Sequence, residues 1–137
     1  MKVLVDTSVW SLALRRRARS EAPVSQELRS LIDDGRVAMI GPIRQELLSG
    51  IRTPESFERL RDHLRPYPDE RLETADFERA AEHFNTCRAR GVRGSNTDFL
   101  ICAVAERRNL SILTTDADFT RFAAVLPITL HGRRAFP

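Results

Sequence analysis

Short apolar segments alternate with amphipathic segments along this chain, and the alternation limits the possible folds more than any other feature. Residues 2–5, 37–40 and 110–114 are short, continuously apolar runs, typical of strands that are buried on both faces. A shorter run at 128–130 is expected to add a last strand. Because segments with helical spacing separate these runs, we predict an α/β fold with a parallel sheet covered by helices on both faces.

Helix start signals divide the segments between the strands. Prolines in the first turn and capping residues mark the expected starts: Pro23, Gly41-Pro42, Thr53-Pro54, Thr74 and Ser95-Asn96. The segment from Thr97 to Arg108 has apolar residues on most faces of the expected helix, so we expect this helix to be buried against the sheet. Asp98, in its first turn, is a charged residue in an otherwise apolar segment.

Length and composition favour one cytoplasmic globular domain. The 137 residues contain no repeat and no linker, so residues 1–137 are expected to form a single domain. Hydrophobic residues make up 42% of the chain, which excludes disordered and low-complexity classes, and no apolar run is long enough to cross a membrane. Cys87 and Cys102 have neither disulfide-framework nor zinc-site spacing and are interpreted as packed, reduced thiols.

The basic residues are almost all arginine. Of the 22 lysine and arginine residues only Lys2 is a lysine, and the formal net charge is +3. Arginine binds phosphates in a bidentate manner and stacks on bases, so the composition permits a nucleic-acid partner. A codon bias towards arginine explains the same composition equally well.

Four carboxylates share one expected position in the fold. Asp6 and Asp116 follow strands, and Glu46 and Asp98 lie in the first turns of helices. Because strand carboxyl ends and helix amino ends lie along one edge of a parallel sheet, all four can converge there. The alternative is that each is a local cap or a partner of a helix dipole.

Such a cluster needs a positive partner, and the sequence offers no lysine there. Two carboxylates about 4 Å apart repel by roughly 4 kcal/mol. His63 and His83 are expected within helices among surface charges, and His131 lies near the C-terminus. An all-oxygen site suits Mg²⁺ or Mn²⁺ rather than zinc, and such an ion activates water for phosphodiester hydrolysis without a side-chain nucleophile.

At these residues the sequence resembles the PIN-domain ribonucleases, and among them the VapC-type toxins of bacterial toxin–antitoxin pairs. The resemblance spans nearly the whole chain and is carried by four motifs: Val3-Leu4-Val5-Asp6-Thr7-Ser8-Val9-Trp10, Arg44-Gln45-Glu46-Leu47-Leu48-Ser49-Gly50, Asn96-Thr97-Asp98-Phe99-Leu100-Ile101-Cys102-Ala103 and Leu113-Thr114-Thr115-Asp116-Ala117-Asp118-Phe119.

The resemblance implies a three-layer α/β/α sandwich with a mainly parallel sheet of four or five strands. It also implies endoribonuclease activity that depends on Mg²⁺ or Mn²⁺ and an RNA substrate such as a tRNA or ribosomal RNA loop. The implied partners are a VapB-like antitoxin, whose C-terminal tail blocks the site, and a second copy of the chain, which together form a homodimer and a toxin–antitoxin hetero-oligomer.

The resemblance also assigns roles to individual residues. Asp6, Glu46, Asp98 and Asp116 form the expected acidic quartet of catalytic and metal-binding residues, with Asp6 and Asp98 as the firmest metal ligands and Asp116 often acting through water. Thr7 or Ser8, together with Thr115, match hydroxyl positions that support the site. Asp118 either supports the site from a distance or caps the helix expected to begin at Phe119, and the cap is favoured.

Other classes fit less well. A haloacid-dehalogenase-like phosphatase needs an aspartate at position 8, where this chain has serine. A response-regulator receiver domain needs a lysine after a late strand, and this chain has none there. Two alternatives stay open: a non-catalytic α/β module that binds RNA or protein, and a housekeeping PIN nuclease without an antitoxin.

Overall fold

The sheet has three parallel strands in the order β2-β1-β3. The computed structural model describes residues 1–14 and 22–132. Within them, β1 (Val3–Val5) lies between β2 (Val37–Ala38) and β3 (Ser111–Leu113). Val3 is opposite both Val37 and Ser111, so the carboxyl ends of the strands lie at one edge. The predicted parallel α/β fold is confirmed.

The sheet is narrower than the expected four or five strands. In the described residues, the segment around Leu130 pairs with β3 through a single parallel bridge, in which Ile112 donates its N–H to Thr129 and accepts one from His131. A second bridge joins Met39 to Asp69 on the other side. Each flanking segment contributes only a bridge, which is too little pairing to form a strand.

The helices begin close to the predicted signals. Their bounds are α1 Thr7–Ala13, α2 Pro23–Asp33, α3 Gly41–Leu48, α4 Pro54–Leu64, α5 Thr74–Ala89, α6 Asn96–Arg108 and α7 Asp118–Val125. Ser95 caps α6 as expected, with its hydroxyl accepting the N–H of Asp98. The cap of α5 is Glu73 rather than Thr74, and its backbone N–H donates to the carboxylate of Asp76.

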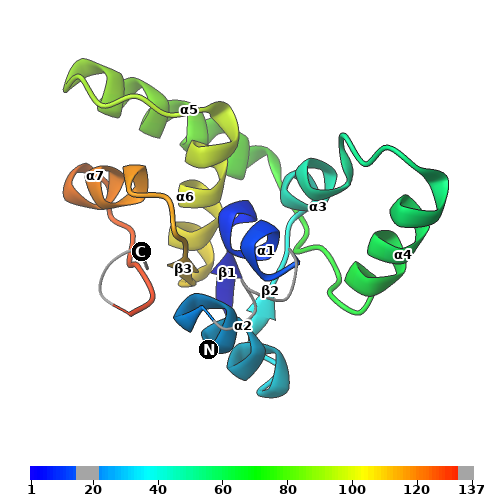
Figure 1. Ribbon diagram of the computed structural model, residues 1–137. Helices are drawn as coiled ribbons and strands as arrows, with labels where there is room; N and C mark the ends of the chain where they lie inside the picture. Colours follow the sequence, from blue (N-terminus) through cyan, green and yellow to red (C-terminus); the bar gives the residue numbers. More distant parts are fainter. Residues whose placement is uncertain (15–21, 133–137) are drawn as a thin grey trace.

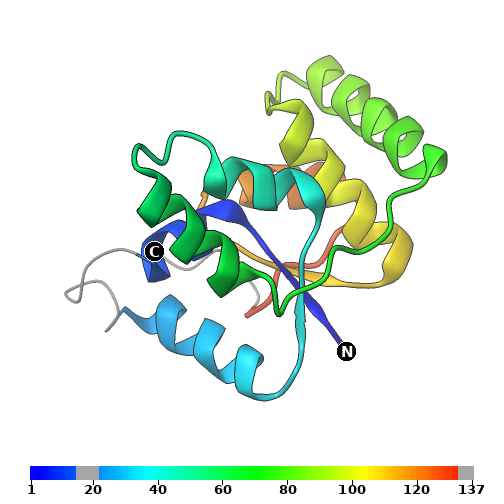
Figure 2. The ribbon, with the colours of Figure 1, turned by 90° about the vertical axis from the view of Figure 1, so that its right-hand side faces the viewer.

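The helices form layers on both sides of the strands. Figure 1 shows the strands near the centre of the molecule, and Figure 2 shows α2 and α4 on one side of them and α5 and α6 on the other. Every residue from Phe99 to Ala105 in α6 is buried, which confirms the predicted burial of this helix. Cys87 and Cys102 are buried free thiols, and burial raises the pKa of both. No helix among the described residues has the length and apolar character needed to cross a membrane.

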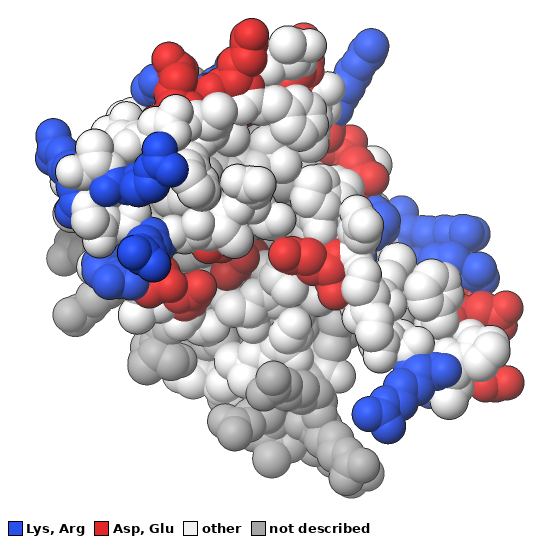
Figure 3. Space-filling model, turned by 90° about the horizontal axis from the view of Figure 1, so that it is seen from above, with Lys and Arg blue, Asp and Glu red and all other residues white. Residues whose placement is uncertain are grey.

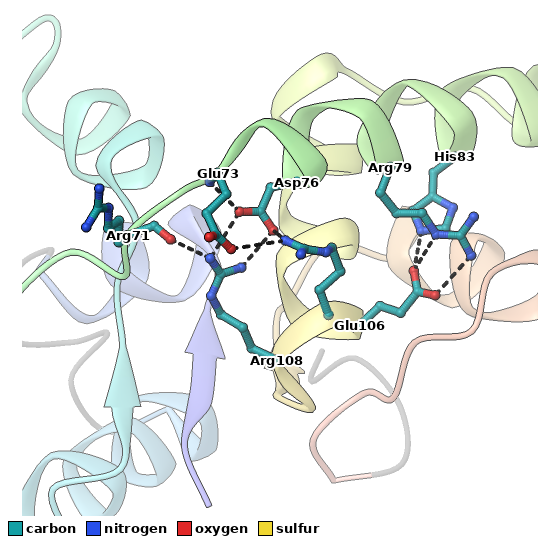
Figure 4. Close-up of polar contacts among 8 residues, drawn as sticks. Arg71, Glu73, Asp76, Arg79, His83, Glu106 and Arg108 are labelled. Atoms are coloured by element: carbon teal, nitrogen blue, oxygen red, sulfur yellow. Dashed lines mark hydrogen bonds and ion pairs between the residues drawn. The ribbon is translucent and has the colours of Figure 1, made fainter.

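Ion pairs fasten the start of α5 to the end of α6 (Figure 4). The side chain of Asp76 is fully buried, and its carboxylate accepts hydrogen bonds from Arg107 at 2.6 Å and from Arg108 at 2.8 and 3.0 Å. Arg108 also donates to the carbonyl of Arg71. Burial opposes ionisation of Asp76, but the bonds from Arg108, from the Glu73 N–H and from Arg107 outweigh it, so its pKa lies well below the ordinary value.

A second polar group joins the middle of α5 to the last turn of α6. Glu106 accepts hydrogen bonds from Arg79 at 2.9 and 3.0 Å and lies 2.7 Å from His83 Nε2. The prediction that His83 lies among surface charges is wrong, because its side chain is buried between α5 and α6. We define Asp76, Arg107, Arg108, Arg79 and Glu106 as the α5–α6 ion-pair network.

Candidate active site

Asp6 lies where β1 ends and α1 begins. Its backbone N–H donates to the carbonyl of Leu113 at 2.9 Å, which ties it to the end of β3. Its side chain is only 6% exposed, and Oδ2 accepts hydrogen bonds from the hydroxyls of Ser8 at 2.8 Å and Thr114 at 2.9 Å. Burial raises the pKa of Asp6, and these hydrogen bonds act against the rise. The carboxylate is therefore held in place but is poorly solvated.

Thr114 joins the ends of β1 and β3, and it is not among the supporting residues expected from the sequence. Its buried hydroxyl donates to Asp6 and accepts the backbone N–H of Asp116 at 2.9 Å. The expected supporting residue Thr115 instead contributes its backbone N–H, which donates to Ser8 Oγ at 3.1 Å. Its position in the sequence could have identified it: Thr114 is the last residue of a buried apolar run, and a polar side chain there needs a hydrogen-bond partner.

Glu46 is linked to the same region through α1. The Thr7 hydroxyl donates to Glu46 Oε1 at 2.7 Å, so adjacent hydroxyls in α1 hold two different carboxylates: Thr7 holds Glu46 and Ser8 holds Asp6. Glu46 itself is exposed. The hydroxyls of Thr7 and Ser8, the expected supporting residues, therefore each contact one of the acidic residues.

Asp98 reaches the site from the amino end of α6. Its Oδ2 accepts the backbone N–H of Ser95 at 3.0 Å, while Oδ1 has no hydrogen bond in the described part of the chain. Burial raises the pKa of Asp98, and the negative charges of Asp6 and Asp116 raise it further. Asp6 and Asp116, from separate parts of the sequence, therefore both lie close enough to Asp98 for their charges to act on its carboxylate.

Asp118 does not have the favoured role. It is the first residue of α7, and its carboxylate pairs with Arg121 at 2.5 Å rather than with the helix amino end. Asp116 makes the local contact instead, because its Oδ1 accepts the backbone N–H of Asp118 at 2.9 Å. The capping interpretation of Asp118 is wrong.

In the described residues no basic side chain pairs with these carboxylates. Within residues 1–14 and 22–132, none of Asp6, Glu46, Asp98 and Asp116 forms a salt bridge. Figure 3 looks onto the end of the molecule where α1, α3 and α6 meet. Acidic side chains line a hollow in the middle of this face, uncharged atoms surround much of it, and basic side chains lie toward both of its ends.

The chemistry of these groups fits a hard divalent cation. The donors are all carboxylate oxygens, a free oxygen of Asp98 remains, and a cation would relieve the repulsion among Asp6, Asp98 and Asp116. In the described residues no three His, Cys, Asp or Glu side chains converge closely enough to enclose an ion. Glu46 and Asp98 are instead held by hydrogen bonds to Thr7 and Ser95.

Comparison with known proteins agrees with this arrangement. Residues 3–125 match the PIN domain family. The chain is 35% identical over 128 residues to Ribonuclease VapC11 of Mycobacterium tuberculosis and to VapC ribonuclease Mb1587 of Mycobacterium bovis, covering 90% of this chain and 92% of each relative.

Solved structures share the fold. VapBC2 from Rickettsia felis, bound to a DNA fragment from its promoter, superposes with a TM-score of 0.78 at 17% identity over 100% of both chains. FitAcB from Neisseria gonorrhoeae gives a TM-score of 0.72 at 21% identity over 98% of this chain and 96% of that chain. A toxin–antitoxin complex from Klebsiella pneumoniae gives 0.64 at 17% identity, covering 86% and 90%.

Proposed function

Because the chain belongs to the PIN-domain family, we propose that it is a Mg²⁺- or Mn²⁺-dependent endoribonuclease and the toxin of a VapBC-type toxin–antitoxin pair. The observation that carries the proposal is that the charges of Asp6 and Asp116 act on the carboxylate of Asp98, while none of the three forms a salt bridge within residues 1–14 and 22–132. A protein bears the cost of such repulsion most readily where a bound ion offsets it.

Asp6 and Asp98 are the residues we assign to hold the metal, with Glu46 and Asp116 beside them. The bound ion supplies a more acidic water and stabilises negative charge on the phosphate. Ser8 and Thr114 orient the carboxylate of Asp6, and Thr7 restrains Glu46. These bonds hold the acidic groups before substrate arrives, which reduces the ordering needed on binding.

The substrate and partners follow from the same proposal. We propose an RNA substrate, with a single-stranded tRNA or ribosomal RNA loop as the preferred kind, since an unpaired backbone can be splayed over an open site. The similar solved structures are described as VapBC2 and as a toxin–antitoxin complex, which supports a VapB-like antitoxin for this chain. We further propose a homodimer that acts in the cytoplasm. Loss of toxicity when a neighbouring small gene is co-expressed would identify the antitoxin.

Replacing Asp98 by asparagine tests the catalytic assignment. Asp98→Asn removes the charge but keeps an oxygen that can accept the Ser95 N–H, so α6 should keep its cap. We expect metal-dependent RNA cleavage to fall by about 100-fold or more, with an unchanged thermal transition by circular dichroism. RNA end-sequencing after brief expression measures the cleavage and identifies the target.

The matched control is Asp62→Asn, which changes an exposed aspartate in α4 whose one ion pair among the described residues is with its neighbour Arg61. This variant should cleave RNA at the wild-type rate. Full activity in Asp98→Asn would reject the proposed site.

A further inference from the structure

We propose that a hollow beside the amino end of α6 binds one unpaired nucleobase of the RNA, next to the bond that is cut. The inference rests on the proposed ribonuclease function and adds a base-binding subsite to it. The hollow lies between α5 and α6, has a volume of about 350 Å³ and is bordered by Phe77, Ala80, Leu100, Asn96 and Thr97. We call it the Phe77 hollow. Its size is within the range of small-molecule sites.

The aromatic wall of the hollow is unusually exposed. Phe77 has 52% of its surface exposed, whereas Phe99, Phe119 and Phe122 are buried and pack against one another. Among the described residues, Phe77 has no aromatic neighbour. A ring with a free face can stack on any nucleobase, and aromatic side chains bind single-stranded RNA in this way.

The floor and rim match the two kinds of surface on a base. Ala80 and Leu100 are buried small or aliphatic residues that suit the flat apolar face of a base. At the rim, the side chains of Asn96 and Thr97 have no hydrogen-bond partner within the part of the chain that is described. An amide can donate and accept at once, as the edge of a base does.

The position of the hollow joins it to the acidic site. Asn96 and Thr97 directly precede Asp98, whose carboxylate feels the charges of Asp6 and Asp116. A base between Phe77 and Asn96 would therefore belong to a nucleotide adjoining the phosphate at the carboxylates. Because the residues bordering the hollow carry no charge, it suits the uncharged base rather than the phosphate backbone.

Binding of RNA to Phe77 variants tests the subsite without requiring cleavage. The probes are short fluorescein-labelled oligoadenylates, intact or with one base removed at each position in turn, measured by anisotropy in EDTA. We expect Phe77→Ala to weaken binding of the intact probe about tenfold and Phe77→Tyr to restore it. Removing one particular base should weaken binding to the wild type but not to Phe77→Ala, since the two losses concern the same contact.

The chain offers a matched control in Phe57, an exposed phenylalanine of α4 with 37% of its surface accessible and outside the residues that border the hollow. Phe57→Ala should bind the probes as the wild type does. Thermal melting of each variant shows whether it is folded. If Phe77→Ala does not fold, Phe77→Leu takes its place in the base-removal series, since leucine keeps an apolar side chain but removes the ring.

The outcomes separate the subsite from the enzyme. One outcome is that the wild-type protein cleaves RNA, but that neither Phe77→Ala nor the removal of any single base weakens binding. This outcome would overturn the subsite and leave the ribonuclease proposal standing. Phe77-dependent, base-dependent binding without any metal-dependent cleavage would support the subsite and overturn the ribonuclease. If Phe77→Ala instead dissociates a dimer in sedimentation and binds RNA normally, the hollow is an interface between copies of the chain, and the base subsite is wrong.

Discussion

The two buried aspartates of the described residues, Asp76 and Asp6, have opposite surroundings. Asp76, at the start of α5, is fully buried and receives hydrogen bonds from Arg107 and Arg108, which hold its pKa well below the ordinary value. Asp6 is almost as well buried, but within the described residues it receives only hydroxyl and backbone hydrogen bonds, and its pKa is raised. The described contacts thus neutralise the charge of Asp76 and leave that of Asp6 without a cation.

The difference separates charges that stabilise the fold from charges that are available for chemistry. An ion pair such as the one at Asp76 ties α5 to α6 and leaves no charge to offer a ligand. A buried carboxylate without a cation costs stability, so its retention indicates another use. α6 connects the two regions, because it carries Asp98 at one end and both arginines at the other.

The largest expected effect follows from breaking the α5–α6 ion-pair network. Asp76→Ala leaves Arg107 and Arg108 without their shared partner and removes the acceptor for the Glu73 N–H. We expect the free energy of unfolding to fall by about 3 kcal/mol, with a thermal midpoint roughly 10 °C lower. Differential scanning calorimetry measures both.

The exposed Asp62 serves as the reference for this change. Asp62→Ala, in α4, should alter stability by no more than about 0.5 kcal/mol. If Asp76→Ala is as stable as Asp62→Ala, the α5–α6 ion-pair network adds nothing to the free energy of unfolding. The claim that Asp76 stabilises the fold, in contrast to Asp6, would then be wrong.

The fold was predictable because its signals are local. Apolar runs mark β1, β2 and β3, and Pro23 and Ser95 mark helix starts, all within a few residues of the observed bounds. The flanking segments near Leu130 and Asp69 were harder, since one bridge depends on tertiary placement rather than on the local pattern. Similarly, Glu73 caps α5 because Asp76 reciprocates, which depends on a pair of residues rather than on a single capping type.

The candidate site was predictable where topology decided it and not where side-chain direction did. Strand ends and helix starts bring Asp6, Asp98 and Asp116 together, as the parallel sheet requires. Which of Thr114 and Thr115 turns its hydroxyl inward depends on the exact end of β3. His83 was misplaced for a related reason, because its partner Glu106 lies on another helix and the two are far apart in the sequence.

A divalent ion bound at Asp6 should supply the positive charge that Arg107 and Arg108 already supply to Asp76. If Asp6 and Asp98 hold Mg²⁺ or Mn²⁺, a metal concentration about ten times the dissociation constant stabilises the folded protein by roughly 1.4 kcal/mol, or about 5 °C in the thermal midpoint. Thermal scans with and without EDTA measure the shift. Asp6→Asn should lose the response and Asp76→Asn should keep it, and a wild-type midpoint that does not respond to metal would exclude a site formed by these carboxylates.

The smallest effect is a difference in pH dependence, and it has opposite signs for the two aspartates. In metal-free protein the pKa of Asp6 is above its ordinary value of 3.8, so its favourable contribution to stability is complete below that value and is lost as the pH rises through the folded-state pKa. The pKa of Asp76 is lowered, so its contribution is complete above 3.8 and is lost as the pH falls through its folded-state pKa. Asp6→Asn should therefore gain stability relative to the wild type as the pH rises from about 4 to about 7, whereas Asp76→Asn should lose its disadvantage only in strong acid. Urea unfolding in EDTA at a series of pH values measures both differences, and a parallel pH dependence in the two variants would mean that their surroundings do not differ in the way the structure shows.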